Sequence, residues 1–290
     1  MTSPALAIMM IIATGGILAG MDVTAKYLAV TFPVFFVIWG RYFFQTLLTF
    51  LAYAGQRRSI NFLKARKPGL QFFRAAALFG ATCTLYVAIT MMPLGDAAAI
   101  QFMAPVLVTL LSGVFLGETV GPRRLAAVGV AFIGVLLIAR PGSGVFGWVA
   151  LLPVATAVLL AIYMMMTRII RSQDDPAATT FYSTAVGAIA LTIIVPFYWT
   201  PLEPFDWLLM VTMGAAGASG HFLWVKAFAA AEASMLAPFT YSQVVAAIAW
   251  GWLVFGDVPS LWTIGGATLI VGSGLYVWYR ETKTARKTAA

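Results

Sequence analysis

The sequence predicts an all-α polytopic membrane protein with ten transmembrane helices in two inverted five-helix repeats and both termini in the cytoplasm. Three observations carry this prediction. Hydrophobic residues make up 61% of the 290 residues and charged residues only 10%, against roughly 25% charged residues in a soluble domain. The chain divides into ten apolar segments, and a pattern from its middle returns near its end. Together these features exclude a soluble globular domain.

The ten apolar segments account for nearly the whole chain. A membrane-spanning helix needs about 20 mainly apolar residues. The segments that meet this requirement are residues 5–28, 34–54, 70–90, 97–116, 123–139, 147–168, 178–197, 207–228, 236–255 and 261–279. Residues 1–4 carry no basic side chain, and the first segment is longer than a signal-peptide core. We therefore expect it to remain as the first helix.

A repeat relates residues 95–138 to residues 234–277. Each stretch has an apolar helix, a Gly-acid turn, a Pro and a second Gly-rich apolar helix. Gly117-Glu118 falls on Gly256-Asp257 at a spacing of 139 residues, and a single deleted residue after the acid extends the match. Five helices is an odd number, so the second half must enter the membrane in the opposite sense. Such inverted repeats are typical of secondary transporters, whose substrate site lies near the midplane.

The distribution of cations predicts the orientation. The loop 56–69 holds five Lys and Arg residues, and by the positive-inside rule it is cytoplasmic. Thirteen of the 18 cations then lie in cytoplasmic loops or in the tail 280–290, and one, Arg140, lies in an outer loop. The net charge of +8 thus reflects orientation rather than nucleic-acid binding. We expect the four cations within segments to snorkel from near helix ends; they are Lys26, Arg41, Arg74 and Lys226.

The order and duplication of these features resemble the drug/metabolite transporter superfamily, EamA type. The resemblance covers nearly the whole chain, with residues 1–140 and 141–279 as the two EamA repeats. Within the family the chain is most similar to bacterial exporters of aromatic and other neutral amino acids. The resemblance implies an inner-membrane efflux carrier with a central cavity lined mainly by helices 1, 3, 4, 6, 8 and 9. Two departures are Asp257 in place of the commoner Glu, and Val244 where the first repeat has Pro105, which could alter the bend of helix 9.

Acidic residues within or near the helices have structural interpretations. Asp22 and Lys26 are four residues apart on one helix face, which predicts an intramembrane ion pair, with a role in a transport pathway as the equally favoured alternative. Glu118 and Asp257 each precede a Pro that could start the next helix, so each carboxylate is expected near a positive helix end. Proton coupling is the alternative role for these two acids.

Polar and aromatic side chains within the segments are candidates for lining a substrate cavity, because lipid-facing positions favour plain aliphatic residues. We expect His221 and Gln243 to hold a polar head group and Trp224, Tyr86 and Tyr163 to form an apolar wall. Packing is the alternative role for each aromatic. The complete candidate substrate-binding set is Tyr86, Gln101, Tyr163, His221, Trp224, Tyr241, Ser242 and Gln243.

The favoured function is a secondary carrier that exports small amphipathic metabolites, most of all aromatic and neutral amino acids. Efflux of cationic drugs is the first alternative, and a passive pore or a non-transporting membrane partner is the second. We expect the bilayer, an amino acid and, as an open alternative, a coupling proton as partners, but neither a cofactor nor a metal. The run Gly217-Ala-Ser219-Gly resembles a protease motif, but Ser219 and His221 point about 200° apart on a helix, so no enzyme is predicted.

Overall fold

The computed structural model describes residues 4–58, 60–116, 121–140, 147–170, 174–231 and 233–289. Helices are the only regular elements among these residues. Eight helices are long and apolar enough to cross a membrane, and two shorter apolar helices, Leu94–Val108 and Leu125–Ala139, accompany them. The predicted fold class, an all-α polytopic membrane protein, is confirmed.

The first repeat contains five spans, of which the fourth is broken into two half-helices. Three of its helices, α1, α3 and α6, begin at prolines, the position at which proline's missing N–H costs nothing. The start predicted at Pro122 is therefore correct. The helices are α1 (Pro4–Leu28), α2 (Val34–Arg57), α3 (Pro68–Met91), α4 (Leu94–Gln101), α5 (Ala104–Leu116) and α6 (Pro122–Ala139).

The second repeat follows the same plan, and again the fourth span is broken. Here α12 begins at Leu261, so the helix start expected at Pro259 is displaced by two residues. The helices are α7 (Leu151–Ile170), α8 (Pro176–Ile194), α9 (Pro204–Ala230), α10 (Ala233–Thr240), α11 (Ser242–Phe255) and α12 (Leu261–Ala289).

The two breaks occupy equivalent places in the repeats. Phe102 lies in the first break and Tyr241 in the second, 139 residues apart, the spacing that relates the repeats. A proline lies within one turn of each break: Pro105 follows the first, and Pro238 precedes the second. Proline removes a backbone donor and crowds the preceding turn. A break therefore forms in the second repeat although Val244 replaces the first repeat's proline.

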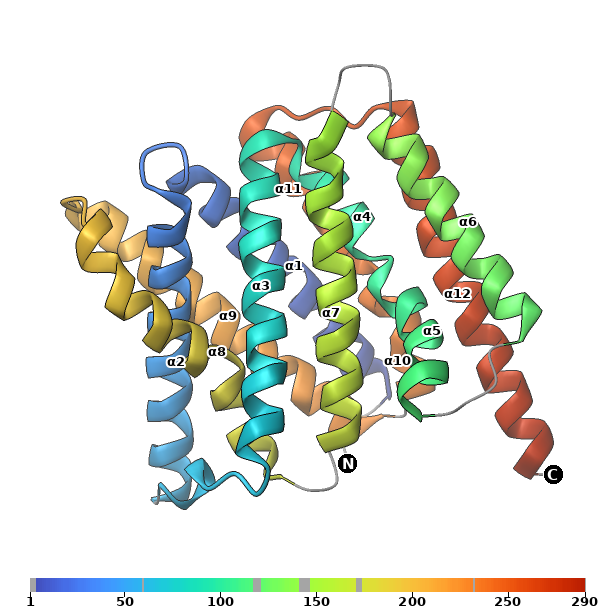
Figure 1. The fold of residues 1–290 in the computed structure, drawn as a ribbon, viewed down its shortest axis with the longest axis horizontal. Coiled ribbons are helices and arrows are strands. Elements are labelled where there is room, and N and C mark those ends of the chain that lie inside the picture. The colour runs from blue at the N-terminus through green and yellow to red at the C-terminus, as the bar shows by residue number, and fades with distance from the viewer. Residues whose placement is uncertain are drawn as a thin grey trace.

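Helix packing obeys the inverted symmetry. The contact of α1 with α9 has its counterpart in the contact of α3 with α7, while α2 packs on α8 and α6 on α12. Helices α6 and α12 stand together at one edge of the bundle (Figure 1). Their close approach depends on Gly134, where a Cβ would lie 2.7 Å from the carbonyl oxygen of Gly266.

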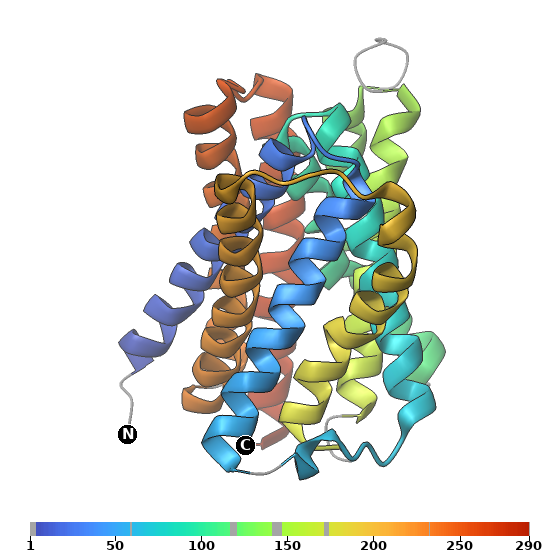
Figure 2. The same ribbon diagram turned by 90° about the vertical axis from the view of Figure 1, so that its left-hand side faces the viewer.

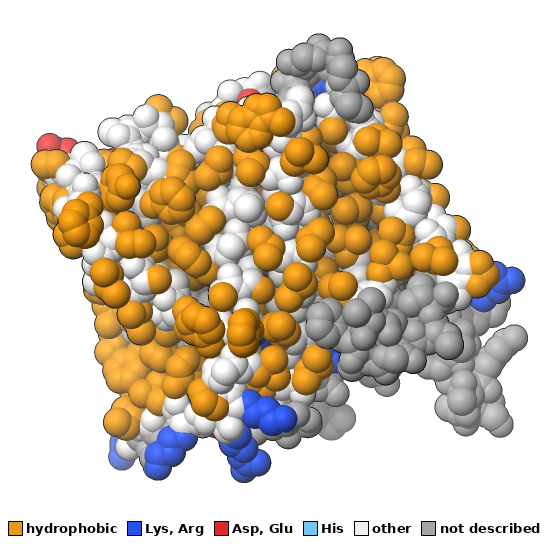
Figure 3. Space-filling model, in the orientation of Figure 1, with side chains coloured by type: hydrophobic (Ala, Val, Ile, Leu, Met, Phe, Trp, Pro, Cys, Tyr) orange, Lys and Arg blue, Asp and Glu red, His pale blue; other side chains and the backbone are white. Residues whose placement is uncertain are grey.

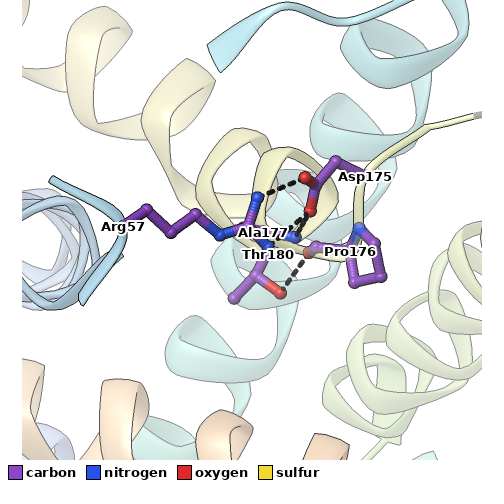
Figure 4. Close-up of polar contacts among 5 residues, drawn as sticks. All are labelled: Arg57, Asp175, Pro176, Ala177 and Thr180. Atoms are coloured by element: carbon purple, nitrogen blue, oxygen red, sulfur yellow. Dashed lines mark hydrogen bonds and ion pairs between the residues drawn. The ribbon is translucent and has the colours of Figure 1, made fainter. Parts of the chain in front are cut away.

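The bundle has two ends of different character. We define the basic face as the end that carries residues 60–67, the start of α1 and the end of α12, and the distal face as the end that carries residues 29–33, 92–93 and 256–260 (Figures 1 and 2). Hydrophobic side chains cover the wall between the two faces, and Lys and Arg gather along the basic edge (Figure 3). At the basic face, Arg57 of α2 pairs with Asp175, the N-cap residue of α8 (Figure 4).

Candidate substrate site

The half-helices α4 and α11 pack against each other in the distal half of the bundle. Gly95 makes this possible, because a Cβ at that position would lie 2.7 Å from Ile248 Cγ1. Where the helices break, the rings of Phe102 and Tyr241 meet with centroids 5.7 Å apart. Equivalent residues of the two repeats thus touch at the interface between the repeats.

Four residues of the predicted set lie at these two breaks. Gln101 and Tyr241 are buried, and Ser242 and Gln243 are partly buried. The Ser242 hydroxyl is buried without a hydrogen-bond partner in the described part of the chain. Gly15 of α1 lets this junction approach closely, since a Cβ there would lie 2.8 Å from Ser242 Oγ and 2.9 Å from the Gln243 backbone nitrogen.

The predicted pair between Asp22 and Lys26 does not form. Lys26 Nζ instead lies 2.9 Å from Asp257 Oδ2 and 3.2 Å from the Met92 carbonyl oxygen. It also stands 4.8 Å from the centre of the Phe255 ring. The long Lys26 side chain reaches past the end of α1 to the distal loop, where a carboxylate from the other repeat is available.

The role expected for Asp257 changes with this pairing. Its carboxylate forms an ion pair with Lys26 and does not lie at the start of α12, which begins four residues further on. The equivalent acid of the first repeat, Glu118, lies outside the described residues. The Lys26–Asp257 pair is only partly buried, with side chains 16% and 26% exposed, and it joins the first repeat to the second at the distal face.

Asp22 instead faces a residue that sequence reasoning missed. Its carboxylate lies within electrostatic range of the Arg41 guanidinium on α2 and of Tyr86 on α3, but it forms no ion pair with Arg41 among the described residues, and Tyr86 Oη has no hydrogen-bond partner there. The guanidinium also lies over the rings of Tyr86 and Tyr42, 5.2 and 5.6 Å from their centroids. Asp22, Arg41 and Tyr86, which we call the Arg41 centre, are 5%, 8% and 1% exposed. The expectation that Arg41 snorkels to a helix end was therefore wrong.

Gln45 and His221 continue the polar line toward mid-bundle. Gln45 lies one turn beyond Arg41 on α2, and its Nε2 is 3.5 Å from His221 Nδ1 on α9. His221 Nδ1 is also 3.0 Å from the Gly217 carbonyl of its own helix. That carbonyl selects the tautomer with the proton on Nδ1 and leaves Nε2 as an acceptor.

The remaining predicted residues have separate surroundings. Trp224 stacks on Phe228 at 5.0 Å and packs on a small apolar cluster near the basic end of α1, α9 and α10, made of Ala7, Ile11, Ala227 and Leu236. Tyr163 lies near Ser183, with 3.4 Å between their hydroxyls. Tyr86, Tyr163 and Trp224 thus belong to three different sets of contacts.

Arg74, which lies over the Tyr163 ring at 5.0 Å, is a second buried cation. It is 0% exposed, so the expectation of snorkelling was wrong here too, whereas Lys226 is exposed as expected. The Arg74 guanidinium donates to side-chain oxygens of Gln71, Thr167 and Ser183 at 3.0 to 3.3 Å. It also donates to the Thr179 carbonyl. These bonds tie α3 to α7 and α8.

An apolar groove of about 480 Å³ runs between α1, α9 and α11. Gly16 and Gly20 line it, and a Cβ at Gly16 would meet nothing within 4 Å. The close approach on α1 is made by the neighbouring Gly15. Among the described residues, no group of three or more His, Cys, Asp or Glu side chains could hold a metal ion.

Comparison with known proteins identifies the family. The EamA-like transporter family matches residues 5–140 and again residues 147–279. The S-adenosylmethionine uptake transporter of Rickettsia conorii is 27% identical over 92% of this chain and 90% of that protein. The riboflavin transporter of Vibrio cholerae is 31% identical over 83% of this chain and 80% of that protein. The pseudopaline exporter of Pseudomonas aeruginosa is 27% identical, covering 87% and 88%.

A solved structure shares the fold. One crystal structure superposes with a TM-score of 0.66 at 17% sequence identity and covers 94% of this chain and 96% of its own. The relatives are named as transporters of small molecules, and the family match spans both repeats. This chain therefore belongs to the EamA-like transporter family and is a multi-pass small-molecule transporter.

Proposed function

We propose that this protein is a secondary carrier of the bacterial inner membrane that exports small amphipathic metabolites, chiefly aromatic and other neutral amino acids. Relatives over most of the chain are named as transporters of S-adenosylmethionine, riboflavin and pseudopaline. The first of these compounds carries a methionine moiety, so an amino-acid head group falls within the chemistry of the family. The basic face is the cytoplasmic face in this proposal.

The observation that carries the proposal is the pair of broken helices. Discontinuous helices at the interface between inverted repeats form the substrate sites of many secondary transporters. Here the breaks at Phe102 and Tyr241 meet directly, and the residues beside them include the unpartnered hydroxyl of Ser242. Broken helices leave backbone groups available to a substrate. A membrane protein that does not transport has no need for such breaks.

Alternating access between the repeats is supported by unequal packing. In the distal half, α4 packs against α11 and α12, and the Lys26–Asp257 pair joins the repeats. The symmetry-related helices of the basic half, α5 and α10, make no comparable contact within the residues that the structure describes. This arrangement fits a state closed at the distal face, which would load substrate from the cytoplasm.

Drug efflux is less well supported than amino-acid transport. A cationic drug requires an unbalanced acid in the membrane. Asp22 does not pair with Lys26, but Arg41 lies within electrostatic range of it, so the Arg41 centre carries one charge of each sign. A passive pore would carry charged rings or a continuous polar lining, whereas the described polar residues form one short line from Arg41 to His221 and a second group at the helix breaks.

Transport by the purified protein in proteoliposomes tests the proposal. We expect saturable counterflow of labelled phenylalanine, leucine and methionine, with riboflavin and S-adenosylmethionine as comparison substrates. An imposed pH gradient shows whether a proton is coupled. Transport of riboflavin without any transport of amino acids would contradict the proposed amino-acid substrates. Net transport only toward the cytoplasmic side of the protein would show uptake and contradict the proposed export.

The orientation has its own test in the background Cys83→Ser, because Cys83 is the single cysteine of the chain. A cysteine at Asn61, beside the basic face, should react with a membrane-impermeant maleimide only from the cytoplasm. A cysteine at Glu203 should react only from outside. Reaction of both cysteines from the same side of the membrane is incompatible with the proposed topology.

A further inference from the structure

The Arg41 centre combines deep burial with unfilled hydrogen-bonding capacity. Its three side chains come from α1, α2 and α3, and each is less than 10% exposed. Neither Arg41 Nε nor Tyr86 Oη reaches a partner at bonding distance within the described part of the chain. Buried polar atoms without partners are rare in native proteins, and a bound ligand is one established explanation for them.

Arg74 provides an internal standard. It is buried as deeply as Arg41, yet its guanidinium is surrounded by oxygen acceptors from Gln71, Thr167, Thr179 and Ser183. A guanidinium that only ties helices together is satisfied in this way. The Arg41 guanidinium is bordered by two aromatic rings and faces the Asp22 carboxylate without forming an ion pair among the described residues.

Free polar capacity extends from the Arg41 centre toward mid-bundle. Gln45, one turn along α2, has a buried Oε1 without a hydrogen-bond partner in the described chain. Its amide lies next to His221 of the second repeat. The Arg41 centre is therefore connected to the depth at which the two repeats meet. A ligand held by Arg41 could extend along this line.

The charges of the centre select the ligand. A carboxylate is the natural partner of a guanidinium, which can bind it with two parallel hydrogen bonds. An ammonium group is the corresponding partner of Asp22. A ligand with only one charge would neutralise one side and leave the other uncompensated in a low-dielectric site. A zwitterion satisfies both sides and leaves the net charge of the centre unchanged.

We infer that the Arg41 centre binds the zwitterionic head of an α-amino acid, with the carboxylate on Arg41 and Tyr86 and the ammonium group on Asp22. This inference rests on the proposed function and assigns its head-group contacts. It also gives the head group to residues other than His221 and Gln243. His221, which Gln45 connects to the centre, then lies toward the part of the substrate beyond the head.

Three ligands with one side chain test the inference. Phenylalanine carries both charges, phenethylamine only the ammonium group, and 3-phenylpropionate only the carboxylate. We expect the purified wild-type protein in nanodiscs to bind phenylalanine roughly 10- to 100-fold more tightly than either analogue, the range for lost charged hydrogen bonds. Asp22→Asn should favour 3-phenylpropionate over phenylalanine, and Arg41→Gln should favour phenethylamine. Lys226→Gln, at an exposed cation, should keep the wild-type order.

Two further variants separate binding from folding. Tyr86→Phe removes only one hydroxyl, and it should weaken phenylalanine binding about tenfold at normal folded yield. Each single variant is expected to lose folded yield. The double variant Asp22→Asn with Arg41→Gln should regain that yield and still fail to bind phenylalanine. A structural pair would instead recover both yield and binding in the double variant.

The two levels of proposal fail differently. Wild-type protein that transports none of the amino acids in proteoliposomes contradicts the proposed function. Wild-type protein that transports phenylalanine, while Asp22→Asn and Arg41→Gln keep the wild-type order of the three ligands, overturns this inference alone. Unchanged phenylalanine affinity in Tyr86→Phe overturns it as well.

Discussion

The distal half of the bundle, where α4 meets α11, and the basic half, which holds α5 and α10, are built from the same repeated sequence pattern but pack differently. In the distal half, α4 packs on α11, and Lys26 reaches across the repeats to Asp257. In the basic half, the described parts of α5 and α10 make no comparable contact, and Ala7, Ile11, Ala227 and Leu236 form a small cluster apart from the main core. Among the described residues, the two repeats are therefore joined more closely in the distal half than in the basic half.

This difference has a simple meaning for a carrier. If each repeat can adopt the packing of the other, the basic half can close as the distal half opens, without new types of contact. Contacts that exist only in the distal half then stabilise one of two states. Removing them should change the balance between the states and therefore the transport rate. The variants below are ordered from the largest expected effect to the smallest.

Loss of the Lys26–Asp257 pair should have the largest effect. Asp257→Asn leaves a partly buried cation without its charged partner, at a cost of about 1–3 kcal/mol. We expect transport to fall at least about tenfold and a cysteine at Ala98, buried in α4, to become reactive from the distal side. The exchanged pair Lys26→Asp with Asp257→Lys should recover much of the transport. Failure of this exchange together with unchanged Ala98 reactivity in Asp257→Asn would exclude a closing role.

The same comparison can be sharpened at the basic face. Arg168 stands two residues before the end of α7, as Lys26 stands two residues before the end of α1. If the two ends alternate, Arg168→Gln should change the reactivity of the Ala98 cysteine in the direction opposite to Lys26→Gln. A change in the same direction would show that the two cations do not act on one equilibrium.

The second effect in size concerns the α4–α11 contact itself. In Gly95→Ala the new methyl group would press on Ile248, with 2.7 Å to Cγ1 and 3.2 Å to Cα. Overpacking of this kind costs about 1–3 kcal/mol, and here the cost applies to the distal-closed state. Distal reactivity of the Ala98 cysteine should rise. Gly129→Ala in α6, where a Cβ meets nothing within 4 Å, is the matched control and should leave it unchanged.

Much of the fold could be predicted from the sequence because the bilayer restricts the possible structures. Apolar runs of about 20 residues have no other use in so hydrophobic a chain, and an odd number of them per repeat fixes the inversion. The helix breaks were not predicted. Pro105 and Pro238 were visible, but proline is tolerated in membrane helices when neighbouring groups replace the lost hydrogen bond. The sequence does not reveal those neighbours.

The site was harder to predict because its charges find partners across the fold. The i, i+4 spacing permitted the Asp22–Lys26 pair, yet Lys26 pairs with a residue 231 positions away. Arg41 was visible as a cation seven residues inside α2, and Gln45 follows it by one turn. The expectation that Arg41 reaches a helix end left the inward-facing positions of Arg41 and Gln45 unpredicted. Burial of the whole Arg41 side chain depends on how α1 and α3 pack around α2.

A third, smaller effect is expected where α1 meets the second break. Gly15→Ala should push α1 away from Ser242 and Gln243, at a cost of roughly 1–2 kcal/mol, because the backbone nitrogen of Gln243 cannot turn aside. The adjacent variant Gly16→Ala points into open space and should retain wild-type thermal stability and transport. Equal effects of the two variants would mean that α1 does not make the close contact at Gly15.

The smallest effect is expected in the seam between α2 and α8. At its distal end, Trp39 Nε1 donates to Thr192 Oγ1 at 3.1 Å, and Phe36 packs on Trp199. At its basic end, Arg57 Nη2 lies 3.1 Å from Asp175 Oδ1 (Figure 4). Asp175 also accepts a 2.8 Å bond from the Ala177 backbone N–H. The Arg57 and Asp175 side chains are 43% and 33% exposed, so the ion pair should contribute no more than about 1 kcal/mol.

This pair has a distinct dependence on pH. The hydrogen bond from Arg57 lowers the pKa of Asp175 below its ordinary value of 3.8. A carboxyl group with a lowered pKa in the folded protein stabilises it fully above the unfolded pKa, and this contribution is lost as the pH falls through the folded pKa. Asp175→Asn keeps an acceptor for Ala177 and loses the charge. Its Tm should lie slightly below the wild-type value at pH 7, and the gap should begin to narrow below about pH 3.8 and close below the folded pKa of Asp175. Thr180→Ala, which removes only a bond to the Pro176 carbonyl within α8, should show a gap that does not vary with pH. A gap for Asp175→Asn that does not narrow between pH 7 and pH 3 would assign the effect to the helix cap rather than to Arg57.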